Sequence, residues 1–596
     1  MKLHILLPAL ILLLHSSMAT AQDIDWQRKV DPILLAKATT ESSVDFLVIL
    51  KTQKALKQKT AFQTKEEKGR YVFKQLQKVA QESQASLTSF LKNKNAFQQS
   101  FYIINAIHAK GDVALLEELA QRPDVSQIQN NPQIKMQEVT TTPTTIDSDA
   151  SDRDDAEWGI QMIGADKVWD MGIGGAGVVV AGQDTGYEWK HPALKEKYRG
   201  WDGTDANHNY NWHDAIREIN LMHEDTVAIT PDLNPCGLSS AIPCDDHNHG
   251  THTMGTMVGR YNDKIIGVAP EAKWIACRNM ERGYGSPVSY IECFEWMLAP
   301  TDLNNENPNP DKAPHVINNS WSCPEVEGCN ENNWTTMNTV VDNLKAAGIV
   351  VVVSAGNNGS KGCETIDTPS AMFSNSFTVG ATMEADTIAH FSSRGPVTVD
   401  GSGRMKPNVA APGFQVLSSI RNNTYQRYNG TSMAGPHVAG TVALMISANP
   451  ELAGQVEAIE NILESTAVPK TNGESCGGLS AETVPNHLAG YGRIDALAAV
   501  EKALAMKSAS DNNDDGVGVV VSPNPARDLI RFELQNFSGA ATIDIFDAAG
   551  RLVISEDLIT DAFQIHQMSL KRLMAGVYFY RVRNEGRVTE GKILRY

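Results

Sequence analysis

The sequence predicts an α/β domain with a parallel sheet in the middle of the chain, a small α+β domain before it and a small all-β domain after it. In residues 158–506, short apolar runs rich in β-branched residues alternate with helical segments, as in sheets buried on both faces. Two polar segments, 138–157 and 507–518, resemble linkers. Residues 519–596 alternate apolar and polar side chains between turns, which is typical of an antiparallel β-sandwich.

The first residues, 1–21, have the features of a secretory signal peptide. Lys2 supplies positive charge, an apolar stretch covers residues 5–14, and small residues at 19 and 21 predict cleavage after Ala21. No later stretch is long and apolar enough to span a bilayer. We therefore expect an exported protein.

Composition limits the partners. The formal net charge is -18 over 596 residues, which disfavours nucleic acids and anionic membrane surfaces as ligands. An even number of cysteines, eight, in an exported chain predicts disulfides. Sequence does not fix their connectivity, and local pairing is the simplest hypothesis: Cys236–Cys244, Cys277–Cys293 and Cys323–Cys329, which leaves Cys363–Cys476.

The α+β segment, 22–137, contains two apolar strand candidates, Asp45–Leu50 and Ser100–Ala109. Apolar residues at helical spacing between positions 72 and 90 predict a long helix, and a shorter helix should follow within 112–125. This segment contains no cysteine.

In the α/β domain, strands are expected at 178–181 and 349–353, with further candidates at 273–277 and 315–320. The glycines at 172, 174 and 177 have the spacing of a dinucleotide-binding fingerprint. That fingerprint must follow a strand and open a helix. Here the strand comes after the glycines, so we interpret them as a loop.

Three side chains suggest chemistry. Asp184 ends a buried strand, His249 begins a helix, and Ser432 lies in a small-residue turn before an apolar helix. Each has an ordinary alternative: a turn aspartate, a zinc ligand together with His247 and His252, and a helix N-cap serine. The histidine spacing differs from the helical zinc motif, which needs two histidines four residues apart with a glutamate.

Asp, His and Ser together are what nucleophilic serine chemistry requires. Imidazole takes the hydroxyl proton and a carboxylate orients the imidazole. In α/β-hydrolases the serine comes first and lies in G-x-S-x-G, whereas here the serine is last and Ala434 replaces the second glycine. This disfavours an esterase. Asn357, in a loop after the strand at 349–353, is a candidate amide donor to an oxyanion, with a plain turn as the alternative.

The segments GQDTG, HGTHTMGTM, SAGNNG and NGTSMAGPHVAG resemble the signatures of subtilisin-like serine peptidases, as do FSSRGP and KPNVAAPG. They cover about residues 158–506, and are nearer to bacillopeptidase F-like members than to the short secreted subtilisins. The resemblance implies a subtilisin-like fold, with Asp184, His249 and Ser432 as the triad and Asn357 as the oxyanion donor.

The resemblance also implies that Ser320, Trp321 and Ser322 lie along bound substrate. The family usually has glycine where this chain has Ser322, which bears on the width of the specificity pocket. Catalysis in this family needs no cofactor. Several members hold structural calcium, although no segment here shows a complete set of oxygen ligands.

The flanking domains resemble other known segments. Residues 22–137 resemble the inhibitor-type propeptide of this family, which helps folding and blocks the cleft until it is cut, with 138–157 as the expected cut region. Residues 519–596 resemble the sorting domain of the type IX secretion system, which implies passage through the outer-membrane machinery of a Gram-negative bacterium.

We therefore expect a secreted serine endopeptidase, made as a zymogen, that acts on proteins or peptides through an acyl-enzyme. The alternative from another class is a surface binding protein that retains the peptidase fold without activity. A complete set of four catalytic positions argues against that alternative.

Overall fold

The computed structural model describes residues 26–56, 62, 64–136, 140–142, 156–220, 222–223, 234–261, 264–321, 323, 327–471, 474–511, 518–522, 524–535, 539–560, 563–584 and 587–595. They form two compact units, Met1–Ala503 and Leu504–Tyr596. The predicted signal peptide and Ser322 lie outside the described residues. None of the helices in this described part is both long enough and apolar enough to cross a membrane.

The N-terminal part of the first unit is an antiparallel sheet covered by helices. The sheet order is β2-β3-β1-β4. Its elements are α1 (Pro32–Ala38), β1 (Val44–Leu50), α2 (Lys65–Asn93), β2 (Gln98–Phe101), β3 (Ala106–Gly111), α3 (Val113–Gln121) and β4 (Val125–Asn130). Apolar residues of β1, β3, α2 and α3 share a buried core. The strand predicted at 45–50 and both predicted helices are confirmed.

One predicted strand is wrong. The apolar run Ser100–Ala109 is split between β2 and β3, which pair with each other, with Phe101 opposite Ala106. A turn at residues 102–105 joins them. The run resembles one strand because the turn residues Ile103 and Ile104 are themselves buried.

The centre of the first unit is a seven-stranded sheet in the order β17-β16-β15-β14-β7-β11-β8, with every neighbouring pair parallel. This confirms the predicted α/β class and all four predicted strands. In chain order the strands are β7 (Val179–Asp184), β8 (Trp212–Asp214), β11 (Lys273–Arg278), β14 (Val316–Asn319), β15 (Val350–Ser354), β16 (Phe377–Thr382) and β17 (Val409–Pro412).

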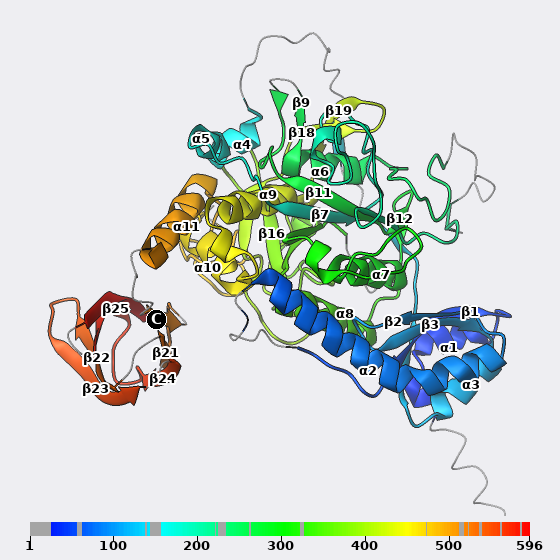
Figure 1. The fold of residues 1–596 in the computed structure, drawn as a ribbon, viewed down its shortest axis with the longest axis horizontal. Coiled ribbons are helices and arrows are strands. Elements are labelled where there is room, and N and C mark those ends of the chain that lie inside the picture. Colours follow the sequence, from blue (N-terminus) through cyan, green and yellow to red (C-terminus); the bar gives the residue numbers. More distant parts are fainter. Residues whose placement is uncertain are drawn as a thin grey trace, which may run out of the picture. The chain divides into compact units, whose positions relative to one another are not determined.

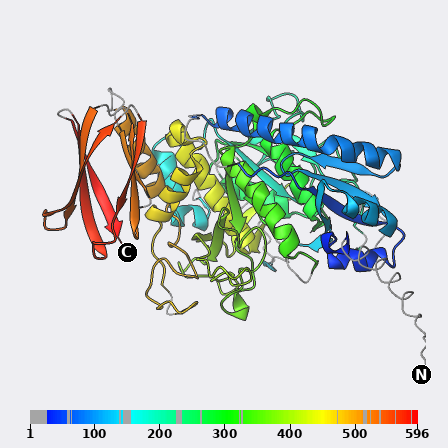
Figure 2. The same ribbon diagram turned by 90° about the horizontal axis from the view of Figure 1, so that it is seen from below.

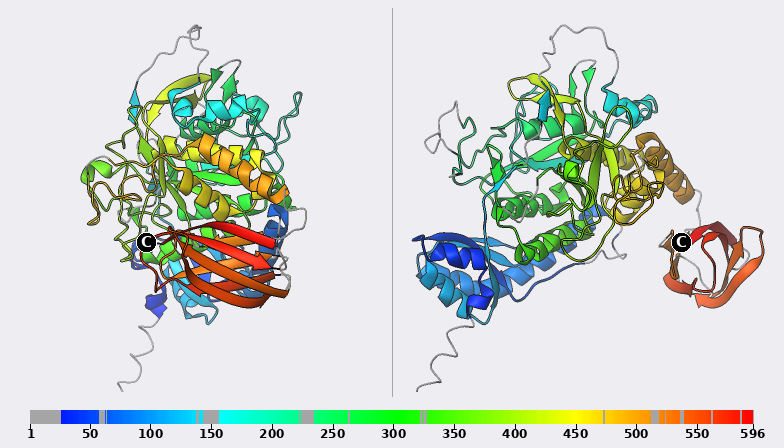
Figure 3. Two further views of the ribbon diagram at one scale, coloured as in Figure 1. Left: turned by 90° about the vertical axis from the view of Figure 1, so that its left-hand side faces the viewer. Right: turned by 180° about the vertical axis from the view of Figure 1, so that it is seen from behind.

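Helices cover both faces of this sheet (Figure 1). On one face α6 (His249–Val258) packs against α9 (Thr431–Ala448), and on the other α7 (Pro287–Leu298) packs against α8 (Glu331–Ala346). α10 (Val456–Thr466) follows α9. The N-terminal sheet and α2 contact α7 and α8, so the N-terminal segment lies against that second layer (Figure 3).

All four disulfides of the local pairing hypothesis are present. Their Cα–Cα distances range from 5.5 to 5.7 Å, and the described residues include no free cysteine. The 113-residue separation of Cys363 and Cys476 makes that bridge by far the longest-range of the four.

The boundary between the two units falls within α11 (Ala496–Asp511), which runs into the segment expected to be a linker. The second unit contains two antiparallel sheets, β20-β21-β24 and β23-β22-β25-β26 (Figure 2). Apolar residues of both sheets share one core. Their bounds are β20 (Gly518–Ser522), β21 (Leu529–Gln535), β22 (Gly539–Asp547), β23 (Leu552–Thr560), β24 (Phe563–Ser569), β25 (Gly576–Asn584) and β26 (Arg587–Arg595). The predicted all-β character is confirmed.

Candidate active site

Asp184 and His249 form a buried pair. Asp184 is the last residue of β7, His249 is the first residue of α6, and the side chains are 1% and 0% exposed. His249 Nδ1 lies 2.8 Å from Asp184 Oδ1 and 2.9 Å from Oδ2. A carboxylate can only accept here, so Nδ1 carries the proton and Nε2 is left as a base. Nε2 is buried and has no hydrogen-bond partner among the described residues.

A glycine next to His249 permits this approach. A Cβ added at Gly250 would lie 2.1 Å from the carbonyl oxygen of Gly186 and 3.1 Å from Asp184 Cβ. Any larger residue at position 250 would therefore push α6 away from the end of β7. The backbone N–H of Gly250 donates instead to Thr185 Oγ1 at 3.1 Å.

Asp245, 4% exposed, is a site residue that the sequence analysis missed. Its Oδ1 accepts from His247 N (2.8 Å), Asn248 N (3.0 Å) and Thr185 Oγ1 (2.9 Å). Its Oδ2 accepts from Thr251 N (3.0 Å) and Thr251 Oγ1 (2.6 Å). These bonds satisfy N–H groups at the start of α6, where Asn248 has φ +104° and makes no side-chain cap. In the sequence, Asp245 is distinguished only as an acidic residue four positions before His249, a pattern too common in loops to indicate a site residue.

Ser432 lies in the first turn of α9, and is 6% exposed. The N-cap position belongs to Gly430 and carries no side-chain cap. The N-cap alternative for Ser432 is therefore wrong. α9 packs directly against α6, which brings the helix that carries Ser432 alongside the helix that carries His249.

Asn357 lies in the loop after β15, next to this first turn. Its Oδ1 accepts from Thr431 N at 2.9 Å and from Thr431 Oγ1 at 3.0 Å. Because a backbone N–H can only donate, the atom facing Thr431 is the amide oxygen. The amide nitrogen is on the other branch of the side chain.

Two of the three expected substrate-binding residues are described. Ser320 follows β14, and its Oγ donates to the carbonyl of Ser432 at 3.4 Å. Trp321 is buried and stacks on Tyr290 of α7, with ring centroids 3.9 Å apart. Both therefore lie between the serine helix and the α7 layer.

The histidines near the site do not share one centre. His252 Nε2 lies 3.1 Å from the carbonyl of Val416 and 3.0 Å from that of Gln426, while its ring stacks on Tyr428. Burial lowers the pKa of His252 to about 3. His249 is held by Asp184 instead. In the described part of the chain, no group of three His, Cys, Asp or Glu residues is arranged to hold a metal ion.

Residues before the catalytic domain run across this region as two short strands. β5 (Ile134–Lys135) pairs antiparallel with β13 (Tyr284–Gly285), and Met136 N donates to the carbonyl of Gly283 at 2.8 Å. β6 (Thr140–Thr142) pairs antiparallel with β19 (Thr424–Asn429), the strand just before Ser432. Part of the expected linker is therefore β-paired, which suits its β-branched threonines.

Comparison with known proteins gives the family. The profile described as "Subtilase family" matches residues 175–492, and that described as "Secretion system C-terminal sorting domain" matches residues 520–595. The second match assigns the chain to type IX secretion, and so to the exterior or the cell surface of a Gram-negative bacterium.

Individual relatives agree. Bacillopeptidase F of Bacillus subtilis (strain 168) is 35% identical over 460 residues, which cover 74% of this chain and 29% of the relative. Subtilisin of Bacillus pumilus is 35% identical over 270 residues (44% and 87%), and subtilisin E of Bacillus subtilis (strain 168) is 29% identical over 378 residues (62% and 77%). The chain thus spans less than a third of bacillopeptidase F but most of each subtilisin. It belongs to the subtilase family of serine peptidases, hydrolases that act on peptide bonds.

Proposed function

We propose that this protein is a secreted serine endopeptidase that is made as a zymogen and cuts itself first. The observation that carries the catalytic part is the buried Asp184–His249 pair, with Nδ1 bound to the carboxylate and Nε2 buried without a described partner. Such a pair is what an imidazole base needs before a substrate and a nucleophile are engaged.

In this mechanism Ser432 Oγ attacks the scissile carbonyl while His249 Nε2 takes the hydroxyl proton. The C–N bond of the tetrahedral intermediate then breaks, the proton passes from His249 to the leaving amine, and an acyl-enzyme remains. Water repeats the cycle and releases the acid. The amide N–H of Asn357 and the backbone N–H of Ser432 donate to the oxyanion, helped by the positive end of α9. Side chains and backbone groups carry every step.

The zymogen part rests on the two short strands. Ile134–Met136 lies along β13 and Thr140–Thr142 pairs with β19, so the chain is held by strand pairing both before and after residues 137–139. Since β19 leads directly into the turn of Ser432, we place the first cleaved bond between Met136 and Thr140. This is at the N-terminal edge of the region expected from the sequence.

The contacts of the N-terminal segment support an inhibitory role. Glu295 of α7 accepts from the backbone N–H groups of Tyr102 (2.5 Å) and Ile103 (2.8 Å). On α8, Asn343 Nδ2 donates to the carbonyl of Ile103 at 2.7 Å. Farther away, Lys65 Nζ of α2 donates to the carbonyl of Ala313 at 2.9 Å. Polar contacts of this kind bind a segment that must later leave.

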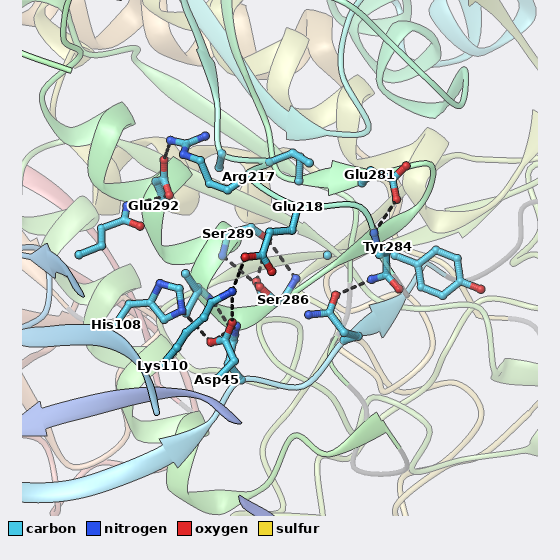
Figure 4. Close-up of a pocket in the computed structure, with 18 of the residues that line it drawn as sticks. Asp45, His108, Lys110, Arg217, Glu218, Glu281, Tyr284, Ser286, Ser289 and Glu292 are labelled. Atoms are coloured by element: carbon cyan, nitrogen blue, oxygen red, sulfur yellow. Dashed lines mark hydrogen bonds and ion pairs between the residues drawn. The ribbon is translucent and has the colours of Figure 1, made fainter. Parts of the chain in front are cut away.

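A cavity of about 400 Å³ lies at this interface (Figure 4). Lys110 reaches across it to Glu218, and also lies 3.4 Å from Asp45 of its own segment. Gln99 Nε2 donates to Glu292 of α7 at 2.8 Å. Burial raises the pKa of Asp45, but the hydrogen bond and charges of His108 and Lys110 outweigh this, and hold that pKa below its ordinary value. The interface is therefore held partly by charge.

The test uses the chain from Gln22, produced in an oxidising compartment as wild type, Ser432→Ala and Ser447→Ala. Ser447 lies in the same helix, where its hydroxyl donates to the carbonyl of Ala176, so it is a matched control. Wild type and Ser447→Ala should lose the N-terminal segment, with a new N-terminus between 137 and 140 by mass spectrometry, and digest casein. Ser432→Ala should stay whole.

Two results would change the proposal. If Ser432→Ala is processed and active like the wild type, Ser432 is not the nucleophile. If all three folded chains stay whole and inert, and remain inert after an added protease cuts the linker, the inactive binding protein becomes the better hypothesis.

A further inference from the structure

Ile134–Met136 is contacted along both of its edges, and the contact on the second edge comes from a residue outside the family motifs. On one side is β13, which pairs with Ile134 and Lys135, and Gly283, just before β13, accepts from Met136 N through its carbonyl oxygen. Backbone N–H groups alternate in direction along a strand, so the N–H of Lys135 points away from β13. It donates to Glu327 Oε1 at 3.2 Å. A side-chain carboxylate therefore takes a backbone donor on the outer edge of the strand.

Glu327 lies close in sequence to a disulfide. Glu327 and Gly328 lie directly before Cys329, which is bonded to Cys323 only six residues away. Gly328 has φ +102°, and a Cβ there would lie 3.1 Å from Pro132 Cβ. Gly328 thus lies against the same N-terminal segment, at Pro132, two residues before Ile134.

The charges favour a basic residue beside Glu327. Glu327 Oε2 is buried and has no hydrogen-bond partner among the described residues. Burial raises the pKa of Glu327 above its ordinary value, and the backbone N–H and the positive charge of Lys135 oppose that rise without cancelling it. Ile134 and Met136 are buried, whereas Lys135 is exposed on the strand between them. At the position of Lys135, the enzyme can therefore recognise the charge of a substrate side chain, whereas at the positions of Ile134 and Met136 it buries apolar side chains.

We propose that Glu327 is a specificity-determining residue, and that the enzyme prefers substrates with lysine or arginine at the position that Lys135 occupies. This rests on the proposed function, in which Ile134–Met136 is bound as the N-terminal side of the first substrate. Glu327 Oε1 accepts from the substrate backbone N–H at this position, and the negative charge of Glu327 favours a basic substrate side chain.

The test measures kcat/KM for peptides that copy residues 130–142, with Lys135 retained or replaced by Gln or Glu. The enzymes are the matured products of the wild-type chain, Glu327→Gln, Glu327→Lys and Glu331→Gln. Glu331 is a nearby exposed acid at the start of α8, so it controls for loss of one negative charge. Ser432→Ala, with its linker cut by an added protease, measures background cleavage.

For the wild type we expect the lysine peptide to be cut about threefold faster than the glutamine peptide and about tenfold faster than the glutamate peptide, the range of a partly exposed ion pair. Glu331→Gln should keep this order, Glu327→Gln should lose it, and Glu327→Lys should reverse it. Equal rates for the three peptides with wild-type enzyme overturn the inference even if a Glu327 variant fails to fold.

The two proposals fail differently. Cleavage that depends on Ser432 but ignores the charge of the peptide overturns the role of Glu327 alone. Cleavage that persists in Ser432→Ala, or no cleavage by any chain, overturns the proposed function and this inference together.

Discussion

Asp245 joins the loop of Asp184 to the helix of His249: its carboxylate accepts from Thr185 Oγ1 at 2.9 Å and from Thr251 N at 3.0 Å. Thr185 directly follows Asp184, and its backbone N–H donates to Asp184 Oδ1 at 2.7 Å. Thr251 lies two residues after His249. One buried carboxylate therefore sets the distance between the two members of the pair, although it contacts no reacting atom.

We predict that Asp245→Asn lowers kcat about 10- to 100-fold with little change in KM, because an amide cannot accept all five hydrogen bonds and small misplacements of catalytic groups are costly. Asp245→Ala should lower kcat further and also the melting temperature. Kinetics on the peptide that copies residues 130–142 would measure both constants.

The control for Asp245 is Asp302→Asn. Asp302 also accepts backbone N–H groups, from Asn304 and Glu306 at 3.0 Å, but in an exposed loop. Its replacement should leave kcat unchanged. If Asp245→Asn keeps full kcat, the carboxylate has only a structural role.

Asn357 accepts hydrogen bonds from Thr431, and the proposed function gives it a second, separable role as a donor to the oxyanion. Asn357→Asp keeps the acceptor and removes the donor, while Asn357→Ala removes both. We expect both variants to lose kcat by about 10²–10³, the loss known for such a donor in subtilisin, with KM little changed. An active Asn357→Asp would mean that the residue only holds the first turn of α9.

Release of the N-terminal segment should depend on pH through Glu295. Burial raises the pKa of Glu295 to about 8, although the N–H groups of Ile103 and Tyr102 oppose the shift. The carboxyl should return towards its ordinary, lower value when the segment leaves. Binding therefore takes up a proton, and must weaken as the pH rises towards 8.

The measurement uses Ser432→Ala with its linker cut by an added protease. Size-exclusion chromatography should show less retained N-terminal segment at about pH 8.5 than at about pH 6, because proton uptake on binding sets the direction of the change. Both N–H groups donate to Glu295 Oε2, so Glu295→Gln keeps an oxygen that can accept from both, but it cannot titrate and should reduce this difference. A pH dependence that is the same in both chains would assign it to other interface carboxylates whose pKa is shifted, such as Glu292 or Asp45.

The disulfides should differ in their contribution to stability. Cys363–Cys476 closes a loop of 113 residues, whereas Cys323–Cys329 closes one of 6. Loop-closure entropy predicts that replacing the first pair with alanine costs about 4–5 kcal/mol of unfolding free energy, and the second about 2–3 kcal/mol. Denaturant unfolding in the Ser432→Ala background, in which the proposed function predicts no self-digestion, would test this. Equal losses would contradict the entropic ranking.

The sequence by itself determined the α/β class, the four recognised strands of the sheet and the family, because buried strands leave continuous apolar runs and the catalytic motifs are local. Asp184 ends a strand, and His249 and Ser432 lie in the first turns of helices, so each motif can be recognised from the local sequence alone. The prediction of a single strand at 100–109 was wrong because Ile103 and Ile104 are buried although they lie in a turn, so the apolar run continues through the turn.

Only the tertiary structure decided the contacts between distant segments. Asp245 became a site residue because β7 and α6 bring Thr185 within reach, 60 residues away. Glu327 meets Lys135 across 192 residues, and Thr140–Thr142 forms a strand only because β19 offers it a free edge. Apolar periodicity records which side of an element is buried. It does not record which polar groups meet there, because sheet order and helix packing set those distances.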